Sequence, residues 1–242
     1  MIPAKEIEFS PWCCGATAPG AVIDPTGLAG VKVELLAASV PGTVASALRD
    51  AGRWDVQAPP DIDTHDWWYR TTFQVSRQSG SEPCRLCFDG LATLAEVWLN
   101  GQRILTTDNM FRTYSVDIVR LLQADNELHI CFRSLSADLK TRRPRPRWKT
   151  NLVNNQQLRW RRATLLGRIP GWSPPVPAIG PWRSVRIERT PVLLSDVHLK
   201  TSLQGTTGVV GINATIVTSQ AVKQARSEEH TSELQSHSDL VC

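Results

Sequence analysis

The 242-residue sequence predicts an all-β protein, an antiparallel β-sandwich with a jelly-roll arrangement. Three observations support this prediction. Apolar residues alternate with polar ones at a period of two in several short segments, a strong hairpin-turn signal joins two of these segments, and only one segment has a convincing helical pattern. A parallel α/β fold is excluded, because it would need crossover helices between its strands.

The predicted helix is short and lies near the N-terminus. Thr43 caps residues 44–51, because its side-chain oxygen can accept a hydrogen bond from the first turn. Gly52 follows at the position where helices commonly end.

The longest alternating segment covers residues 67–75. Its odd positions share one face of a strand, and its even positions share the other. The first set is Trp67, Tyr69, Thr71, Phe73 and Val75, and the second is Trp68, Arg70, Thr72 and Gln74. We therefore expect a strand with one face in a core.

Shorter segments repeat this alternation. Asn100-Gly101 is the strongest hairpin signal, because both central residues of a type I′ turn need a positive φ. The residues expected to point inward are Leu86, Phe88, Val97, Leu99, Leu128, Ile130, Phe132, Val185 and Ile187. The expected strands are 85–89, 97–99, 102–105, 126–132 and 182–187.

The pattern resets at Thr190-Pro191. Val197 and Leu199, and then residues 212–216, predict two strands separated by a Gly-rich turn at 205–211. Two strands cannot close a core alone. We expect a first domain over 1–189 and an incomplete second sandwich over 190–225.

The last segment, residues 226–242, has no helical or strand period. Residues 226–237 resemble the in-frame translation of a common sequencing adapter, so we expect a non-native, disordered tail. Without it the chain has 26 basic and 19 acidic residues, and its net charge rises from +4 to +7.

Composition excludes several classes of protein. No apolar run approaches the roughly 20 residues of a membrane span, and the charged N-terminus does not fit a secretory signal, so we expect a cytoplasmic protein without membrane contact. The six Cys lack a disulfide framework, and Cys84-x-x-Cys87 has no second pair at metal-like spacing. We expect reduced thiols, no metal and no cofactor.

Tryptophan is unusually frequent. Nine Trp outnumber the two Tyr and five Phe together. Most of them are expected in the core, but such an excess in a strand-rich, Pro-rich chain also suggests flat surfaces for a ligand with apolar faces, such as a sugar.

Seven motifs, in their order and spacing over some 150 residues, resemble the family 2 glycoside hydrolases, and within them the β-mannosidase-like branch. The motifs are Val40-Pro41-Gly42-Thr43-Val44, Asp66-Trp67-Trp68-Tyr69-Arg70, Phe88-Asp89-Gly90-Leu91, Val97-Trp98-Leu99-Asn100-Gly101, Asp108-Asn109-Met110-Phe111-Arg112, Pro146-Arg147-Trp148-Lys149-Thr150 and Ile179-Gly180-Pro181-Trp182-Arg183. The resemblance covers about residues 10–222.

The resemblance implies a galactose-binding-like jelly roll, then the first strands of an immunoglobulin-like sandwich. In this family a (β/α)₈ barrel follows, and two of its glutamates catalyse retaining hydrolysis of terminal β-glycosides. A barrel needs roughly 250 residues. We therefore expect this chain to lack catalytic residues, to bind a terminal β-linked sugar, and to depend on a C-terminal barrel in cis.

The resemblance also implies three substrate-binding residues. Asn109 matches a loop Asn that binds the sugar, Arg112 belongs to the same motif, and Trp172 matches the second Trp of a Gly-Trp-Asp-Trp-Gly-Pro pattern. Gly171 stands where that pattern has Asp, which weakens the case for β-mannoside specificity. For Asn109 the alternative is that its amide only stabilises its own turn.

Three other functions fit the sequence less well. Residues 142–162 are rich in Arg and contain Trp148 and Trp160, a composition that a nucleic-acid-binding surface would have. The Pro residues and the family motif within this segment argue against it, so we expect no nucleic acid as a partner. A free-standing carbohydrate-binding module is the main alternative. A small catalytic domain is disfavoured, because only His65, His129 and His198 precede the tail and no Gly-x-Ser-x-Gly motif is present.

Overall fold

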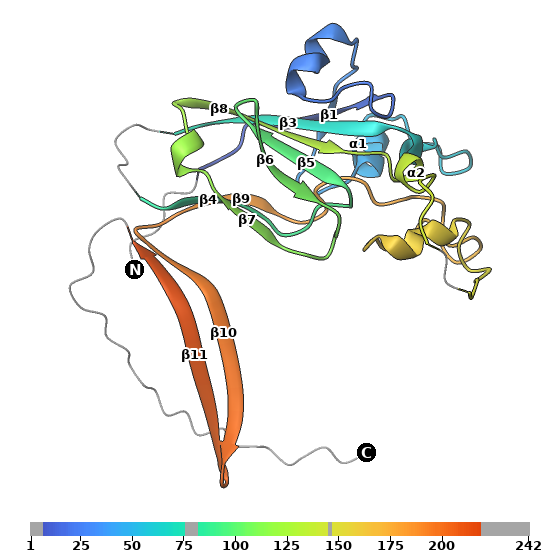
Figure 1. The fold of residues 1–242 in the computed structure, drawn as a ribbon. Helices are drawn as coiled ribbons and strands as arrows, with labels where there is room; N and C mark the ends of the chain where they lie inside the picture. Colours follow the sequence, from blue (N-terminus) through green and yellow to red (C-terminus); the bar gives the residue numbers. More distant parts are fainter. Residues whose placement is uncertain (1–6, 76–81, 145–146, 219–242) are drawn as a thin grey trace. The chain divides into compact units, whose positions relative to one another are not determined.

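The computed structural model describes residues 7–75, 82–144 and 147–218, which form two units, one ending at Thr190 and one starting at Pro191. The first unit is a two-layer β-sandwich (Figure 1). The larger sheet contains β1 (Trp12–Thr17), β2 (Leu36–Ala38), β3 (Asp66–Gln74), β5 (Ala95–Leu99), β6 (Gln102–Thr107) and β8 (Asp125–Phe132). The smaller sheet contains β4 (Cys84–Phe88), β7 (Tyr114–Asp117) and β9 (Val185–Arg189).

The strand order confirms the predicted all-β sandwich. The larger sheet runs β2-β1-β3-β8-β5-β6 and the smaller one β7-β4-β9, with antiparallel neighbours throughout. Several of these neighbours are far apart in the chain, as a jelly roll requires.

The core lies between the two sheets. The register places Tyr69 of β3 opposite Ile130 of β8, and both side chains are fully buried. Most of the predicted inward residues on the other strands are buried with them: Leu86, Phe88, Val97, Leu99, Leu128, Phe132 and Ile187. Val185 is only partly buried and packs against this core. The Asn100-Gly101 turn is also confirmed, with φ of 51° and 80°.

The outer face of the larger sheet is buried in part, which the alternation in residues 67–75 does not indicate. Trp68 stacks on Trp98 with ring centroids 5.2 Å apart. Val22 packs on this pair, and the Arg133 guanidinium donates to the Val22 carbonyl at 2.7 Å. The segment that includes η1 (Pro25–Gly30) therefore covers this face, as the blue ribbon in Figure 1 shows.

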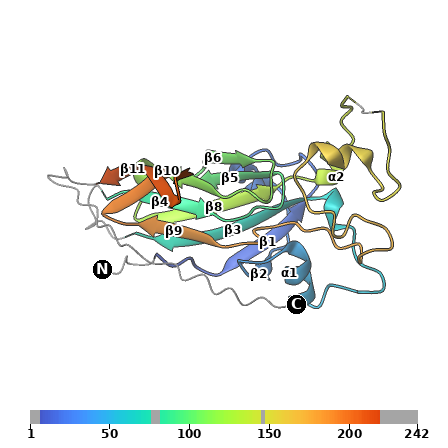
Figure 2. The same ribbon diagram turned by 90° about the horizontal axis from the view of Figure 1, so that it is seen from below.

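Helix α1 (Val44–Asp50) confirms the helix prediction. Thr43 and Ser46 form a reciprocal capping box, and Gly52 follows with φ of 68°. The helix packs beside β2 at the edge of the larger sheet (Figure 2). The structure adds elements that were not predicted. They are the strands β1, β2 and β7, the short helix α2 (Leu135–Asp138), and the 3₁₀ segments η1, η2 (Ile62–Thr64), η3 (Val119–Leu121) and η4 (Gln156–Trp160).

The predicted strand 182–187 is wrong at its start. Strand β9 begins at Val185, which lies opposite Phe88, the last residue of β4. The Asp89 N–H still donates to the Ser184 carbonyl at 3.0 Å, but residues 182–184 lie outside the strand. Trp182 instead donates its indole N–H to the carbonyl of Met110 at 2.9 Å.

The second unit is a single hairpin of β10 (Val192–Gln204) and β11 (Thr207–Thr218). The predicted long turn at 205–211 is wrong, because β11 already begins at Thr207 and Gly205, with φ of 63°, makes a tight turn. Asp196, with φ of 50°, lies at a bulge that shifts the register between Ser195 and His198.

This bulge has a consequence for the hairpin's surface. Because the bulge adds one residue to β10, Leu194 before it and Leu199 after it lie on the same face of the hairpin as their partners on β11. The side chains on this apolar face are exposed. They include Leu194, Leu199, Ile212 and Ile216. An immunoglobulin-like sandwich over 190–225 stays a prediction, and the predicted tail 226–242 lies outside the described residues.

In the part of the chain that the structure describes, no helix is both long and apolar enough to cross a membrane.

Candidate functional site

Asn109 lies in the loop that joins β6 to β7. Its side-chain oxygen accepts a hydrogen bond from the backbone N–H of Phe111 at 3.0 Å, so it stabilises its own turn. Its backbone pairs with Arg162, and its carbonyl accepts from the Tyr114 hydroxyl at 3.3 Å. Among the described residues, nothing accepts from the amide nitrogen Nδ2. One half of the amide is therefore used by the turn, and the other half is available to a ligand.

The neighbouring Met110 anchors the loop. Its backbone N–H donates to the carbonyl of Arg162 at 3.0 Å, and its own carbonyl accepts from the Trp182 indole. Trp182 can approach because Gly90 lies beneath it: a Cβ on Gly90 would come within 2.6 Å of the indole nitrogen. Three segments that are distant in sequence thus fix the position of Asn109.

The exposed rim of this loop carries the side chains next to Asn109. Phe111 is 56% exposed and meets the edge of Trp182 at a centroid distance of 6.3 Å. The Arg112 guanidinium lies 5.6 Å from the centre of the Tyr114 ring, and none of the described residues accepts a hydrogen bond from it. An amide donor, an aromatic ring and a guanidinium therefore share one rim, a set that suits a ligand with hydroxyls and apolar faces.

Trp172 lies on a different segment. It is 78% exposed, and no hydrogen bond or ring contact in the described structure joins it to Asn109 or Arg112. Gly171 before it has φ of 80°, a conformation that an Asp adopts only with strain. The local backbone conformation therefore suits Gly171, at the position where the Gly-Trp-Asp-Trp-Gly-Pro pattern has Asp. The structure brings Asn109 and Arg112 together but does not join Trp172 to them.

The segment that carries Trp172 is held by an ion pair that the sequence did not indicate. Arg168 binds both carboxylate oxygens of Asp63 in η2, and Ser136 donates to the same carboxylate at 2.9 Å. The two charged side chains are 12% and 10% exposed. No spacing rule links residues 63 and 168, so only the fold reveals this contact.

A second ion cluster centres on Asp138 of α2. Arg143 and Arg161 bind its carboxylate at 2.8 and 2.6 Å. Burial raises the pKa of the Asp138 carboxyl, but its bonds to Arg161 and Arg143 outweigh this and lower it. Residues 140–187 contain no Asp or Glu, and three Arg of this acid-free stretch, Arg143, Arg161 and Arg168, are thus engaged inside the domain.

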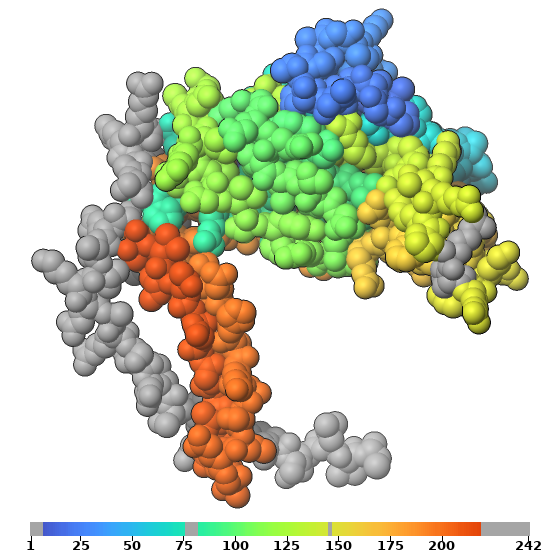
Figure 3. Space-filling view, viewed as in Figure 1, coloured from blue at the N-terminus to red at the C-terminus, as the bar shows by residue number. Residues whose placement is uncertain are grey.

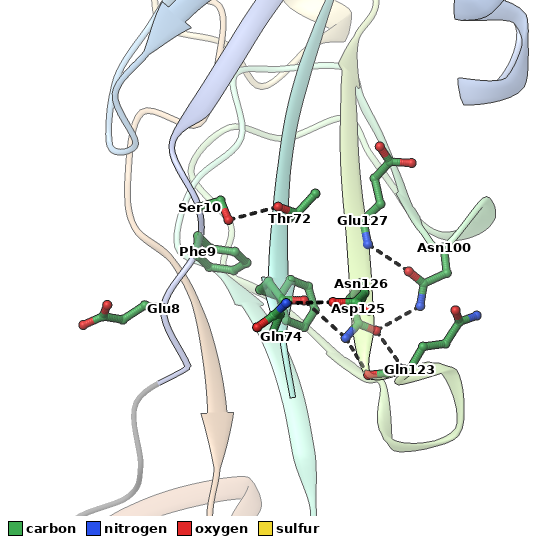
Figure 4. Close-up of a pocket in the computed structure, with 11 residues that line it drawn as sticks. Glu8, Phe9, Ser10, Thr72, Gln74, Asn100, Gln123, Asp125, Asn126 and Glu127 are labelled. Carbon is green, nitrogen blue, oxygen red and sulfur yellow. Dashed lines mark hydrogen bonds between the residues drawn. The ribbon is translucent and has the colours of Figure 1, made fainter. Parts of the chain in front are cut away.

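A broad cavity of about 740 Å³ lies where β3 ends and β8 begins, near residues 8–10 (Figure 4). Its amides bind one another: Asn100 donates to Asn126 at 3.0 Å and accepts from the Glu127 N–H at 2.9 Å. Asn126 in turn donates to the carbonyl of Gln123 at 2.8 Å. Because these amides hold the β5–β6 turn, the cavity offers fewer free hydrogen-bond donors than the Asn109 loop does.

The cysteines of the described residues do not form a reactive centre. The five in the described part of the chain are free thiols, and burial raises the pKa of Cys14 to about 12 and that of Cys84 to about 11. Such thiols stay protonated and are poor nucleophiles. No group of three or more His, Cys, Asp or Glu among the described residues is placed to hold a metal ion.

Comparison with known proteins places the chain in a family. The family described as glycosyl hydrolase 2 galactose-binding domain-like matches residues 27–183, which include Asn109, Arg112 and Trp172. β-Mannosidase B of Thermothelomyces thermophilus is 31% identical over 164 residues, which cover 66% of this chain and 19% of that protein. β-Mannosidase B of Aspergillus terreus is 30% identical over 148 residues, 59% of this chain and 17% of that protein.

Solved structures show the same fold. The β-D-mannosidase of Dictyoglomus thermophilum superimposes with a TM-score of 0.62 at 25% identity, over 88% of this chain and 26% of that one. The exo-chitosanase of Amycolatopsis orientalis gives 0.55 at 18% identity, over 88% of this chain and 25% of that one. The matched region thus spans about a fifth to a quarter of these relatives. The chain belongs to the glycosyl hydrolase 2 galactose-binding domain-like family, and it is similar in sequence and structure to the corresponding domain of β-mannosidases.

Proposed function

We propose that this chain is a non-catalytic, sugar-positioning domain of a β-mannosidase-like family 2 glycoside hydrolase. Its role is to hold a terminal β-linked sugar at the mouth of a catalytic barrel, which would be a partner in cis. Retaining hydrolysis belongs to two glutamates of that barrel. The similarity to β-mannosidases in sequence and fold supports this assignment.

One observation at the site carries the proposal. The Asn109 side chain uses its oxygen for the turn and leaves its Nδ2 donors free, while Met110 and Arg162 fix the loop from both sides. A donor held in this way loses little entropy when it binds a sugar hydroxyl. Arg112, in the same loop, can contribute a second donor, and Trp172 an exposed ring.

The test is the activity and binding of the purified 242-residue chain. We expect no hydrolysis of p-nitrophenyl β-D-mannoside, and weak binding of β-mannosides that is reduced in Asn109→Ala. Hydrolysis that copurifies with the chain and withstands further purification would refute a non-catalytic role. Strong mannoside binding that is unchanged in Asn109→Ala would favour a free-standing carbohydrate-binding module instead.

A further inference from the structure

A second cavity, of about 290 Å³, lies between η4 and the loop that precedes it. Its volume is close to the lower end of the range for small-molecule sites. The side chains that form its floor and walls are Trp148, Lys149, Asn154, Gln157, Arg159 and Trp160. This part of the chain, yellow in Figure 3, lies at the surface of the sandwich unit.

The wall of the cavity is held in place by Gln156. Its amide nitrogen donates to the carbonyl of Thr150 at 2.6 Å, and its oxygen accepts from the Thr150 N–H at 3.2 Å. Arg159 donates to the same oxygen at 2.7 Å. The loop and η4 are therefore tied together before any ligand arrives.

Two tryptophan rings are exposed at the cavity. Trp148 is 61% exposed and Trp160 is 45% exposed. The Arg159 guanidinium lies over one face of Trp148, 4.2 Å from the ring centre. Most large aromatic side chains are largely buried in folded proteins, so two exposed ones at a cavity indicate a binding surface.

The polar groups around these rings are cationic or neutral. The side chains of Lys149, Asn154 and Gln157 have no hydrogen-bond partner among the described residues, and no carboxylate lines the cavity. Free amides suit sugar hydroxyls, and Lys149 and Arg159 give the cavity a positive potential.

We propose that this cavity binds an acidic saccharide, one that carries a carboxylate or a sulfate ester. The sugar rings stack on Trp160 and on the face of Trp148 that Arg159 leaves free. Asn154 and Gln157 bind the sugar hydroxyls, and Lys149 binds the anionic group. The site goes beyond the proposed function, because it uses none of the Asn109 loop.

A single-stranded nucleic acid is the other ligand that would use aromatic stacking and cations. It would need a basic groove that follows its phosphates beyond the cavity. The neighbouring Arg143 and Arg161 are instead bound to Asp138, and Arg168 to Asp63. These engaged guanidiniums favour a short saccharide over a nucleic acid.

The experiment titrates the 242-residue chain, with tryptophan fluorescence as readout, against three probes: a mannuronic acid trisaccharide, neutral mannotriose and an oligothymidylate of ten nucleotides. We expect the acidic trisaccharide to bind best. Trp148→Ala and Trp160→Ala should each weaken it about tenfold or more, because each removes a stacking surface. Trp160→Phe keeps an aromatic ring, so it should retain part of the affinity that Trp160→Ala loses.

Lys149→Ala should weaken the acidic trisaccharide and leave mannotriose unchanged. Lys32→Ala, which removes an exposed lysine elsewhere, should leave the affinity for the acidic trisaccharide unchanged. Circular dichroism of each variant checks that the fold is kept. Equal affinity for mannotriose, tighter binding of the oligothymidylate, no binding at all, or unchanged binding in both folded Trp→Ala variants would overturn the proposal.

Discussion

Arg168 and Asp63, 105 residues apart in the sequence, form a two-point ion pair that is nearly buried. It ties the segment before Trp172 to η2, and η2 leads directly into β3 of the larger sheet. The exposed Trp172 is therefore presented from an anchored segment, although no contact joins it to the Asn109 loop.

We expect Asp63→Asn to destabilise the protein by about 2–3 kcal/mol, because breaking one side of a buried ion pair leaves the Arg168 charge without compensation. The measurement is the free energy of unfolding in urea. Trypsin should also cut after Arg168 faster in the variant.

The matched control is Asp50→Asn. Asp50 pairs with Arg49 on the surface, where the Arg49 side chain is 70% and the Asp50 side chain 55% exposed, so we expect a change below about 0.5 kcal/mol. Equal effects of the two substitutions would show that the Asp63–Arg168 pair does not anchor the segment.

The pH dependence of stability should report on His129. This side chain is 5% exposed, and its Nδ1 has no hydrogen-bond partner among the described residues. Burial lowers the pKa of His129, Glu127 at 4.0 Å opposes this, and Arg70 on the neighbouring strand lowers it further.

The unfolded chain therefore binds a proton at His129 more readily than the folded chain does. Stability is full above the ordinary histidine pKa of about 6.5 and is lost as the pH falls below it. Thermal midpoints measured from pH 8 to pH 5 should fall less steeply for His129→Gln than for the unchanged chain. The exposed His65→Gln is the control, and a slope in His129→Gln as steep as in this control would contradict the prediction.

The β10–β11 hairpin should promote association between copies. Its apolar face is exposed, with Leu199 at 66% and Ile212 at 71%, and its edges can pair with other strands. We expect a chain shortened to residues 1–190 to remain monomeric at concentrations where the full chain associates, as measured by light scattering. Ile212→Lys in the full chain should have a similar effect. If the shortened chain aggregates more, the boundary near Thr190 is wrong.

Local patterns predicted much of the first unit. The period-two alternation located β3, β4 and β8, because one face of each strand packs in the core. Asn100-Gly101 located the β5–β6 hairpin, and Thr43 located the start of α1. Each of these signals is local, so it can be recognised without knowledge of what packs against it.

The rest depends on contacts between distant residues. The alternation in β3 gave no sign that Trp68 is also buried, because the segment around Val22 covers it. The charges of the acid-free stretch suggested a basic surface, yet Asp63 and Asp138 bind three of its Arg. That no hydrogen bond or ring contact among the described residues joins Trp172 to Asn109 likewise follows from the fold and not from motif order.

The role of Asn109 can be measured with a hybrid enzyme, in which residues 1–190 replace the corresponding domain of the Thermothelomyces thermophilus β-mannosidase B. Asn109→Asp keeps the oxygen that accepts from Phe111 but removes the free Nδ2 donors, so it separates sugar binding from turn stability. Asn109→Ala removes both functions, and the unchanged hybrid is the reference.

The Michaelis constant of this hybrid for p-nitrophenyl β-D-mannoside is the most direct test of the sugar-positioning role. We predict that Asn109→Asp raises it about two- to tenfold, the range expected for one lost hydrogen bond, with the thermal midpoint unchanged. A Michaelis constant that stays the same or falls in Asn109→Asp, with only a lower thermal midpoint in Asn109→Ala, would show that Asn109 serves its turn alone and would contradict the account.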